Sequence, residues 1–282
     1  MELVVLSGKG GTGKTTIATA LSELSQEVVR VDCDVDAPNF YLFYNGNNIE
    51  KSDFIGGKKA LIDEELCIKC GECKVNCKFN AIEDFKINSF LCEGCGTCTL
   101  VCPKNAITLV DEKIAETFIT ELDNGILSRA EMEIGSEGSG KLITHLRKEA
   151  KKFNENDKLI IIDGSPGIGC PVISSITGSD VVLIVTEPTK SALEDLKRIV
   201  DLCEYFSVFI MVCINKYDIN KEITLEIEYF IQNKKIKYVG KIPYDETVRK
   251  SINELKPITY YKDSQANKAI EDIWINIKSL IS

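Results

Sequence analysis

Eight of the twelve cysteines in this 282-residue chain fall into two runs that share the spacing C-x2-C-x2-C-x3-C. Three thiolates separated by two residues each can wrap one face of an iron–sulfur cubane, and the fourth is carried by the turn toward a second cluster. The spacing therefore predicts two [4Fe–4S] clusters whose ligands cross between the runs. One cluster would be held by Cys67, Cys70, Cys73 and Cys102, and the other by Cys92, Cys95, Cys98 and Cys77.

The two runs form an internal repeat with an offset of 25 residues. Gly71 recurs as Gly96, and Asn80-Ala81-Ile82 recurs as Asn105-Ala106-Ile107, as expected of a duplicated supersecondary unit. The segment from about Lys58 to Val110 resembles a bacterial two-[4Fe–4S] ferredoxin module and matches all eight of its ligands. Lys78 departs from that family, which usually has proline there, but the change removes no ligand.

Disulfides and zinc are the alternative uses of these cysteines. Disulfides need an oxidising compartment, of which the sequence shows no sign. Zinc sites usually pair two C-x2-C arms across a longer spacer than the one found between these cysteines. Iron–sulfur clusters are therefore the favoured interpretation.

A second chemical motif lies near the start of the chain, where Gly8-Lys9-Gly10-Gly11-Thr12-Gly13-Lys14-Thr15 matches G-x-x-x-x-G-K-[ST]. It follows an apolar run typical of a buried strand and precedes a helix pattern, as a phosphate-binding loop requires. The glycines let backbone N–H groups face phosphates, Lys14 would reach the β/γ-phosphates, and the Thr15 hydroxyl would bind Mg²⁺. The expected nucleotide-binding residues here are Gly8, Gly10, Gly11, Thr12, Gly13, Lys14, Thr15 and Thr16.

The loop carries a second lysine, Lys9, and its run K-G-G-x-G-K-T-T resembles that of the MinD/ParA/Mrp and nitrogenase iron protein group of ATPases. The resemblance implies that Lys9, with no clear duty in its own chain, reaches across a homodimer to the partner's nucleotide. A solvated loop lysine is the alternative. In this group the second aspartate of switch I, here Asp34, orients the attacking water and faces the metal. Asp163, in a Walker B pattern, would hold the Mg²⁺ shell, and the Gly167 N–H would sense the γ-phosphate.

The nucleotide base is expected to lie beside the ends of two later strands. The resemblance implies that Asn215 contacts the base and that the stretch containing Pro243 closes over it. The run from Asn215 to Asp218 also fits the N-x-x-D of GTPases, in which the aspartate reads guanine. Lys9 and switch I favour ATP over GTP.

Four cysteines lie outside the two runs. We interpret Cys33, Cys203 and Cys213 as packed thiols. Cys170 follows Asp163 within switch II, and we weigh two hypotheses for it. One is a packed thiol beside a proline, and the other is a transient metal ligand that meets its counterpart across a dimer.

Apolar strands that alternate with helices predict an α/β fold, a doubly wound parallel sheet of the P-loop NTPase type. The ATPase domain would be discontinuous, covering residues 1–57 and 111–282, with a small α+β ferredoxin-like insert at residues 58–110. Residues 135–140 are expected to form a flexible loop. The apolar face of the C-terminal helix is expected to pack on the sheet.

The composition limits the kinds of partner that the chain is expected to bind. A net charge of −9 argues against nucleic-acid binding, for which a basic patch is expected. No apolar run reaches the roughly 20 residues that span a bilayer, and the N-terminus shows no signal-peptide pattern. We therefore expect a cytoplasmic protein that binds neither nucleic acid nor membrane.

Together the motifs predict a Mg²⁺-dependent ATPase that also binds two [4Fe–4S] clusters. Its nucleotide-dependent homodimer would couple ATP hydrolysis to electron transfer, or to cluster or metal delivery, to a redox or cluster-accepting partner protein. One alternative is a MinD/ParA-like spatial-positioning ATPase in which the clusters are structural or sensing. Another is an ATP-dependent enzyme of the cobyrinic acid synthase type, which the single histidine disfavours, because such enzymes use a Cys–His pair to hydrolyse glutamine.

Overall fold

The computed structural model describes residues 1–25, 27–136, 139–154 and 158–281. It divides into two compact units. The first comprises Met1–Lys51, Phe118–Ala130 and Ser139–Ser282, and the second comprises Ser52–Thr117 and Glu131–Gly138. Two long strands, β3 (Asn47–Ile62) and β6 (Ile107–Leu122), run through both units.

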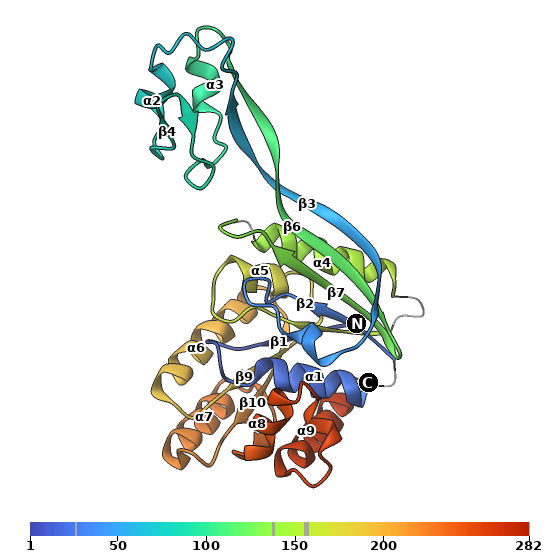
Figure 1. The fold of residues 1–282 in the computed structure, drawn as a ribbon. Coiled ribbons are helices and arrows are strands. Elements are labelled where there is room, and N and C mark those ends of the chain that lie inside the picture. Colours follow the sequence, from blue (N-terminus) through green and yellow to red (C-terminus); the bar gives the residue numbers. More distant parts are fainter. Residues whose placement is uncertain (26, 137–138, 155–157, 282) are drawn as a thin grey trace. The chain divides into compact units, whose positions relative to one another are not determined.

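The first unit is built on a sheet with the strand order β11-β10-β9-β1-β8-β2-β7-β6-β3 (Figure 1). Neighbouring strands from β11 to β7 all pair in parallel. The strands not yet given are β1 (Glu2–Leu6), β2 (Val28–Asp32), β7 (Gly125–Met132), β8 (Leu159–Asp163), β9 (Val181–Thr186), β10 (Phe209–Asn215) and β11 (Lys237–Ile242).

The sheet is mostly, but not wholly, parallel, which corrects the uniformly parallel sheet expected from the sequence. Only two residues, Asp123 and Asn124, connect β6 to its neighbour β7. So short a connection can join only antiparallel strands. The turn ends at Gly125, whose φ of 136° favours glycine, and the run Asp-Asn-Gly is itself a hairpin signal.

Helices cover both faces of this sheet. Leu3 and Val5 of β1 share one apolar core with α1 and α9, while Val4 and Leu6, which point the opposite way, are equally buried. Burial on both faces is why the central strands are nearly continuous apolar runs. The helices are α1 (Lys14–Leu24), α4 (Ser139–Lys152), α5 (Cys170–Ile176), α6 (Lys190–Tyr205), α7 (Lys221–Asn233), α8 (Glu246–Asn253) and α9 (Gln265–Ile281), with 3-10 turns at Phe40–Phe43 and Ile258–Tyr260.

The flexible loop predicted at residues 135–140 extends too far, because its last two residues belong to a helix. Residues 137 and 138 lie outside the described part of the chain, and α4 already begins at Ser139. The expected packing of the C-terminal helix is confirmed, because Ile270, Ile273 and Ile277 of α9 are buried in the core beside β11.

The second unit contains the two cysteine runs and, between the ends of β3 and β6, four short elements. These are α2 (Glu72–Asn76), β4 (Ile82–Glu83), β5 (Lys86–Ile87) and α3 (Thr97–Val101). The sequence repeat is also a backbone repeat: Gly71 and Gly96 precede α2 and α3 with φ of 84° and 78°. Cys77 and Cys102 end these helices with ψ of 110° and 112°. The two runs therefore adopt one local fold twice.

Candidate functional site

The phosphate-binding loop opens onto a cavity of about 550 Å³, a size ordinary for a small-molecule site. Switch I, switch II and α8 line its other sides. Of the predicted nucleotide and metal residues, the cavity wall includes Gly10, Gly11, Gly13, Lys14, Thr15, Thr16 and Asp34. Leu42, Phe43, Ile252 and Leu255 give it an apolar part.

The buried carboxylate of Asp163 is the centre of the polar contacts in this site. Its two oxygens lie 2.6 Å from the Lys14 Nζ and 2.6 Å from the Thr15 Oγ1. Asp34 Oδ2 lies 3.6 Å from the same Lys14 Nζ. Burial lowers the pKa of Lys14, but the charges of Asp163 and Asp34 outweigh it and raise that pKa above its usual value. The structure thus brings these four side chains, which the sequence analysis singled out, to one place.

Asp32 adds a third carboxylate and fixes the shape of switch I. Its oxygens accept hydrogen bonds from the backbone N–H groups of Asp34 (3.2 Å) and Phe40 (3.1 Å), so that it caps the loop between them. Burial, helped by the charge of Asp163, raises the pKa of Asp32 to about 8.

The donor set fits a Mg²⁺–nucleotide pair. Asp32, Asp34 and Asp163 all lie near Lys14, and a divalent cation would add positive charge to this cluster of carboxyl groups. Mg²⁺ usually takes only one or two carboxylates and completes its shell with water and substrate phosphates. Asp163 and the Thr15 hydroxyl would hold the Mg²⁺, and Asp34 would orient a water molecule. When a nucleotide binds, Lys14 would release the Asp163 carboxylate and bind the phosphates instead.

Switch II is tied to both neighbouring strands. The Gly167 N–H donates to the Ser7 carbonyl over 2.9 Å, so this hydrogen bond would have to break before Gly167 could sense a γ-phosphate. The Ser165 hydroxyl donates to the Cys33 carbonyl over 2.6 Å, and the Cys33 N–H donates to the Asp163 carbonyl over 2.8 Å. Ser165, which the sequence analysis did not single out, therefore links switch II to switch I.

Lys9 has a partner within its own chain, and the expectation that it has no duty there is wrong. Its Nζ lies 2.9 Å from Glu187 Oε1 at the end of β9, and 3.4 Å from the Thr189 hydroxyl. Glu187 also pairs with Lys216. The sequence offered no signal for this contact, because 178 positions separate Lys9 from Glu187 along the chain.

Asn215, predicted to contact the base, braces the phosphate-binding loop. Its Nδ2 donates to the Thr12 carbonyl over 2.7 Å. Gly13 has φ of 93°, and a Cβ there would lie 2.3 Å from that Nδ2, so only glycine fits. Asp218 Oδ1 accepts a hydrogen bond from the Tyr244 N–H over 2.7 Å and so closes the loop that follows β11. Pro243, in that loop, does not line the cavity described above.

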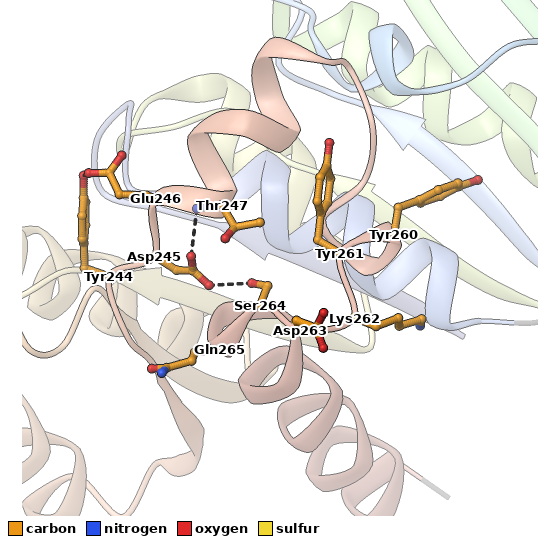
Figure 2. A pocket seen from close by; sticks show the side chains of 10 residues that line it. All are labelled: Tyr244, Asp245, Glu246, Thr247, Tyr260, Tyr261, Lys262, Asp263, Ser264 and Gln265. Atoms are coloured by element: carbon orange, nitrogen blue, oxygen red, sulfur yellow. Dashed lines mark hydrogen bonds between the residues drawn. The ribbon is translucent and has the colours of Figure 1, made fainter.

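The same loop borders a second cavity, of about 680 Å³, between α8 and α9 (Figure 2). Tyr244 and Tyr260 are exposed on its rim, while Asp245 and Ser264 lie at its floor, joined by a 2.6 Å hydrogen bond. The Asp245 carboxylate also accepts from the Thr247 N–H over 2.8 Å. The Asp245 carboxylate therefore holds the loop that contains Pro243 in place.

In the second unit, thiols from both cysteine runs come together. One cavity is lined by Cys77 from the first run and by Cys92, Cys95 and Cys98 from the second. Burial raises the pKa of Cys73, and Cys67 and Cys70, which lie nearby, raise it further. Three backbone N–H groups point at sulfur: those of Ala60, Ala81 and Ala106 lie 3.5, 3.4 and 3.3 Å from the sulfurs of Cys92, Cys77 and Cys102.

The arrangement of these cysteines bears on which kind of metal group they could hold. Among the described residues, no group of three or more His, Cys, Asp or Glu side chains is arranged to hold one metal ion. In a cubane each thiolate binds a different iron, so its ligands do not converge on one point. N–H groups aimed at sulfur are also among the features that tune such clusters.

The remaining cysteines divide as follows. Cys33, Cys203 and Cys213 are buried, which confirms that they are packed thiols. Burial raises the pKa of Cys203 and of Cys213, each to about 12, so neither is reactive at neutral pH. Cys170 is exposed at the first residue of α5, which corrects the interpretation of a packed thiol.

Comparison with known proteins decides the family of the chain. The model of the CobQ/CobB/MinD/ParA nucleotide binding domain matches residues 3–258. The chain belongs to this family. The expected ATP-binding, MinD/ParA-type P-loop ATPase is thereby confirmed.

Relatives of this CobQ/CobB/MinD/ParA protein match almost its full length. An uncharacterized protein of Methanocaldococcus jannaschii is 39% identical over 285 residues, which cover 100% of this chain and 98% of that protein. An uncharacterized ATP-binding protein of the same organism is 29% identical and covers 96% of this chain and 95% of its own length. The septum site-determining protein MinD of Pyrococcus horikoshii, solved with Mg-ADP, has a TM-score of 0.61 at 18% identity, covering 100% of this chain and 97% of that one. This last likeness concerns the fold.

Within the described residues of this family member, no helix is both long and apolar enough to cross a membrane.

Proposed function

We propose that this protein is an ATP-binding iron–sulfur protein. ATP binding and hydrolysis would switch a homodimer, and the switch would gate electron transfer, or delivery of a cluster or metal, to a partner protein. Family membership supports the ATPase half of this proposal. The iron–sulfur half is carried by one observation: thiols from two separate runs, Cys77 and the Cys92–Cys98 triplet, line one cavity.

This lining supports the proposal of a pair of clusters with crossed ligands. If each run served its own metal, Cys77 would lie with the first three cysteines of its run. It lies instead with the second triplet, as crossed ligation requires. Cys102 occupies the matching position in the repeat, with the same helix-ending backbone as Cys77. We infer that Cys102 completes the first cluster.

Crossed ligation can be tested by counting iron in protein prepared without oxygen. The full chain should hold about eight iron and eight sulfide atoms. Replacing Cys92, Cys95 and Cys98 together with serine should leave about four. Adding Cys102→Ser should then remove the remaining iron, whereas adding Cys77→Ser should not.

Cys170→Ser is the matched control, because that thiol is exposed and lies outside both runs. Its iron content should equal that of the unaltered chain. Tightly bound zinc, or about four iron atoms in the unaltered chain, would refute the two clusters. Loss of the remaining iron on adding Cys77→Ser, rather than Cys102→Ser, would refute the crossing alone.

A spatial-positioning ATPase is the second candidate, and the likeness to MinD favours it. In that case the clusters would be sensors or supports, and ATP would make the protein bind a membrane or DNA. The net charge of −9 opposes both surfaces. Sedimentation with anionic vesicles or with DNA, in ATP and in ADP, separates the two functions. ATP-dependent sedimentation would favour positioning, and ATP-dependent oxidation of the clusters by an acceptor would favour the main proposal.

A further inference from the structure

Glu187 binds two lysines, one within the phosphate-binding loop and one that directly follows β10. Its Oε1 lies 2.9 Å from the Nζ of Lys9, a residue of the loop itself. Its Oε2 lies 3.2 Å from the Nζ of Lys216, which follows β10. Lys216 also donates to the Gly11 carbonyl over 3.1 Å. The carboxylate thus bridges the loop lysine to a second lysine that is anchored on the loop backbone.

The surroundings of Glu187 make this bridge more than a surface ion pair. Its side chain is 16% exposed, against 36% for Lys9 and 30% for Lys216. Burial acts to raise the pKa of Glu187, but hydrogen bonds from both lysines outweigh it and hold that pKa below its usual value. The Thr189 and Ser191 hydroxyls lie 3.4 and 3.5 Å from the same Lys9 Nζ. Lys9 is therefore held by one charge and two hydroxyls.

We propose that Glu187 is a positioning residue that keeps Lys9 on its own chain until nucleotide binding and dimerisation draw the lysine away. The proposal rests on the nucleotide-dependent dimer of the proposed function. A lysine held by Glu187 cannot at the same time contact a phosphate of the partner's nucleotide. Lys216 keeps its bond to the Gly11 carbonyl when Lys9 leaves, so the loop stays braced. Glu187 then sets how readily the dimer forms.

The bridge can be tested first without any dimer. Partial acylation of amines in the isolated protein, read by mass spectrometry, reports how accessible each lysine Nζ is. In Glu187→Gln, acylation of Lys9 should rise about two- to fivefold, the range expected for loss of a partly exposed ion pair. The matched control is Glu194→Gln, which removes a carboxylate from α6 that pairs with Lys197. Unchanged acylation of Lys9 in Glu187→Gln would overturn the proposal.

The second measurement is the dimerisation constant with a non-hydrolysable ATP analogue, taken by analytical ultracentrifugation. Glu187→Gln should dimerise at a protein concentration about two- to fivefold lower than the unaltered chain. In a Lys9→Ala background the same substitution should give no gain. A gain that persists without Lys9, or weaker dimerisation in Glu187→Gln, would overturn the proposal. If the unaltered chain forms no dimer, the proposed function fails, while the acylation result still decides whether Glu187 holds Lys9.

Discussion

Asp245→Ala is the substitution whose effect the structure specifies most fully. Asp245 is the N-cap of α8, and its carboxylate accepts from the Thr247 N–H (2.8 Å). The other oxygen accepts from the Ser264 hydroxyl over 2.6 Å (Figure 2). It also accepts from the Ala266 N–H at the start of α9 over 3.1 Å. One side chain therefore caps two helices and fixes the loop that follows β11.

The expected loss follows from these two caps. Replacing a capping aspartate with alanine costs about 1 kcal/mol for one helix. Because the carboxylate of Asp245 serves both α8 and α9, the free energy of unfolding should fall by about 2 kcal/mol. The loop that contains Pro243 should also loosen, so we expect weaker nucleotide binding if Pro243 closes over the base as predicted.

The pH dependence of this loss has a definite sign. Burial acts to raise the pKa of Asp245, but hydrogen bonds from Ser264 and Thr247 outweigh it and hold that pKa below its usual value. A carboxyl with a depressed pKa stabilises the folded state above its unfolded pKa, about 4, and loses this contribution as the pH falls through its folded pKa. The difference between Asp245→Ala and the unaltered chain should therefore be the same at pH 8 and pH 5 and shrink below about pH 4.

Denaturant unfolding without oxygen, followed by the fluorescence of the single tryptophan, measures the loss. Trp274 is buried on α9, one of the two capped helices, so its signal reports the relevant region. Asp263→Ala is the matched control, because it removes the same charge from an exposed position in the same cavity. A loss below about 0.5 kcal/mol, or one equal to that of Asp263→Ala, would show that the carboxylate does not cap both helices.

Two further predictions concern the nucleotide site. We expect ATP to bind more tightly than GTP, because Asp218 already accepts a hydrogen bond from the Tyr244 N–H and so closes the loop after β11. Competition binding measures this preference. A clear preference for GTP would show that Asp218 reads the base. Ser165→Ala removes the buried bond to the Cys33 carbonyl and should lower the free energy of unfolding by about 1–2 kcal/mol. It should also slow hydrolysis more than it weakens nucleotide binding, with the exposed Ser279→Ala as control, and unchanged turnover would contradict the link between the switches.

The parts of the fold and site that the sequence predicted are those whose chemistry lies in contiguous residues. The strand, glycine loop and helix from β1 to α1 follow from an apolar run, a motif of fixed spacing and a helix pattern. Asp34 and Asp163 each stand in a local motif of the ATPase group that the chain resembles, and that resemblance implied their place beside Lys14. The buried state of Cys33 followed from the alternation of side chains along an extended segment.

The parts that the sequence did not predict depend on contacts between distant residues. Glu187 meets Lys9 only because β9 lies beside β1 in the sheet, a register that no local pattern encodes. Packing beside Pro171 was one of two hypotheses for Cys170, but this residue begins helix α5 and its side chain is exposed. The antiparallel pair of β6 and β7 was missed although Asn124-Gly125 is a hairpin signal, because the parallel pattern was extended past it.

The contacts around β8 would couple nucleotide binding to movement of the switches. Asp163 holds Lys14 and Thr15 through its carboxylate, and it holds the Cys33 N–H through its carbonyl. Two residues further on, Ser165 holds the Cys33 carbonyl. A nucleotide that draws Lys14 to its phosphates must therefore disturb the same residue that joins the two switches. Coupling between the nucleotide site and the two switches would need no long pathway, because β8 ends at Asp163, which contacts residues of both.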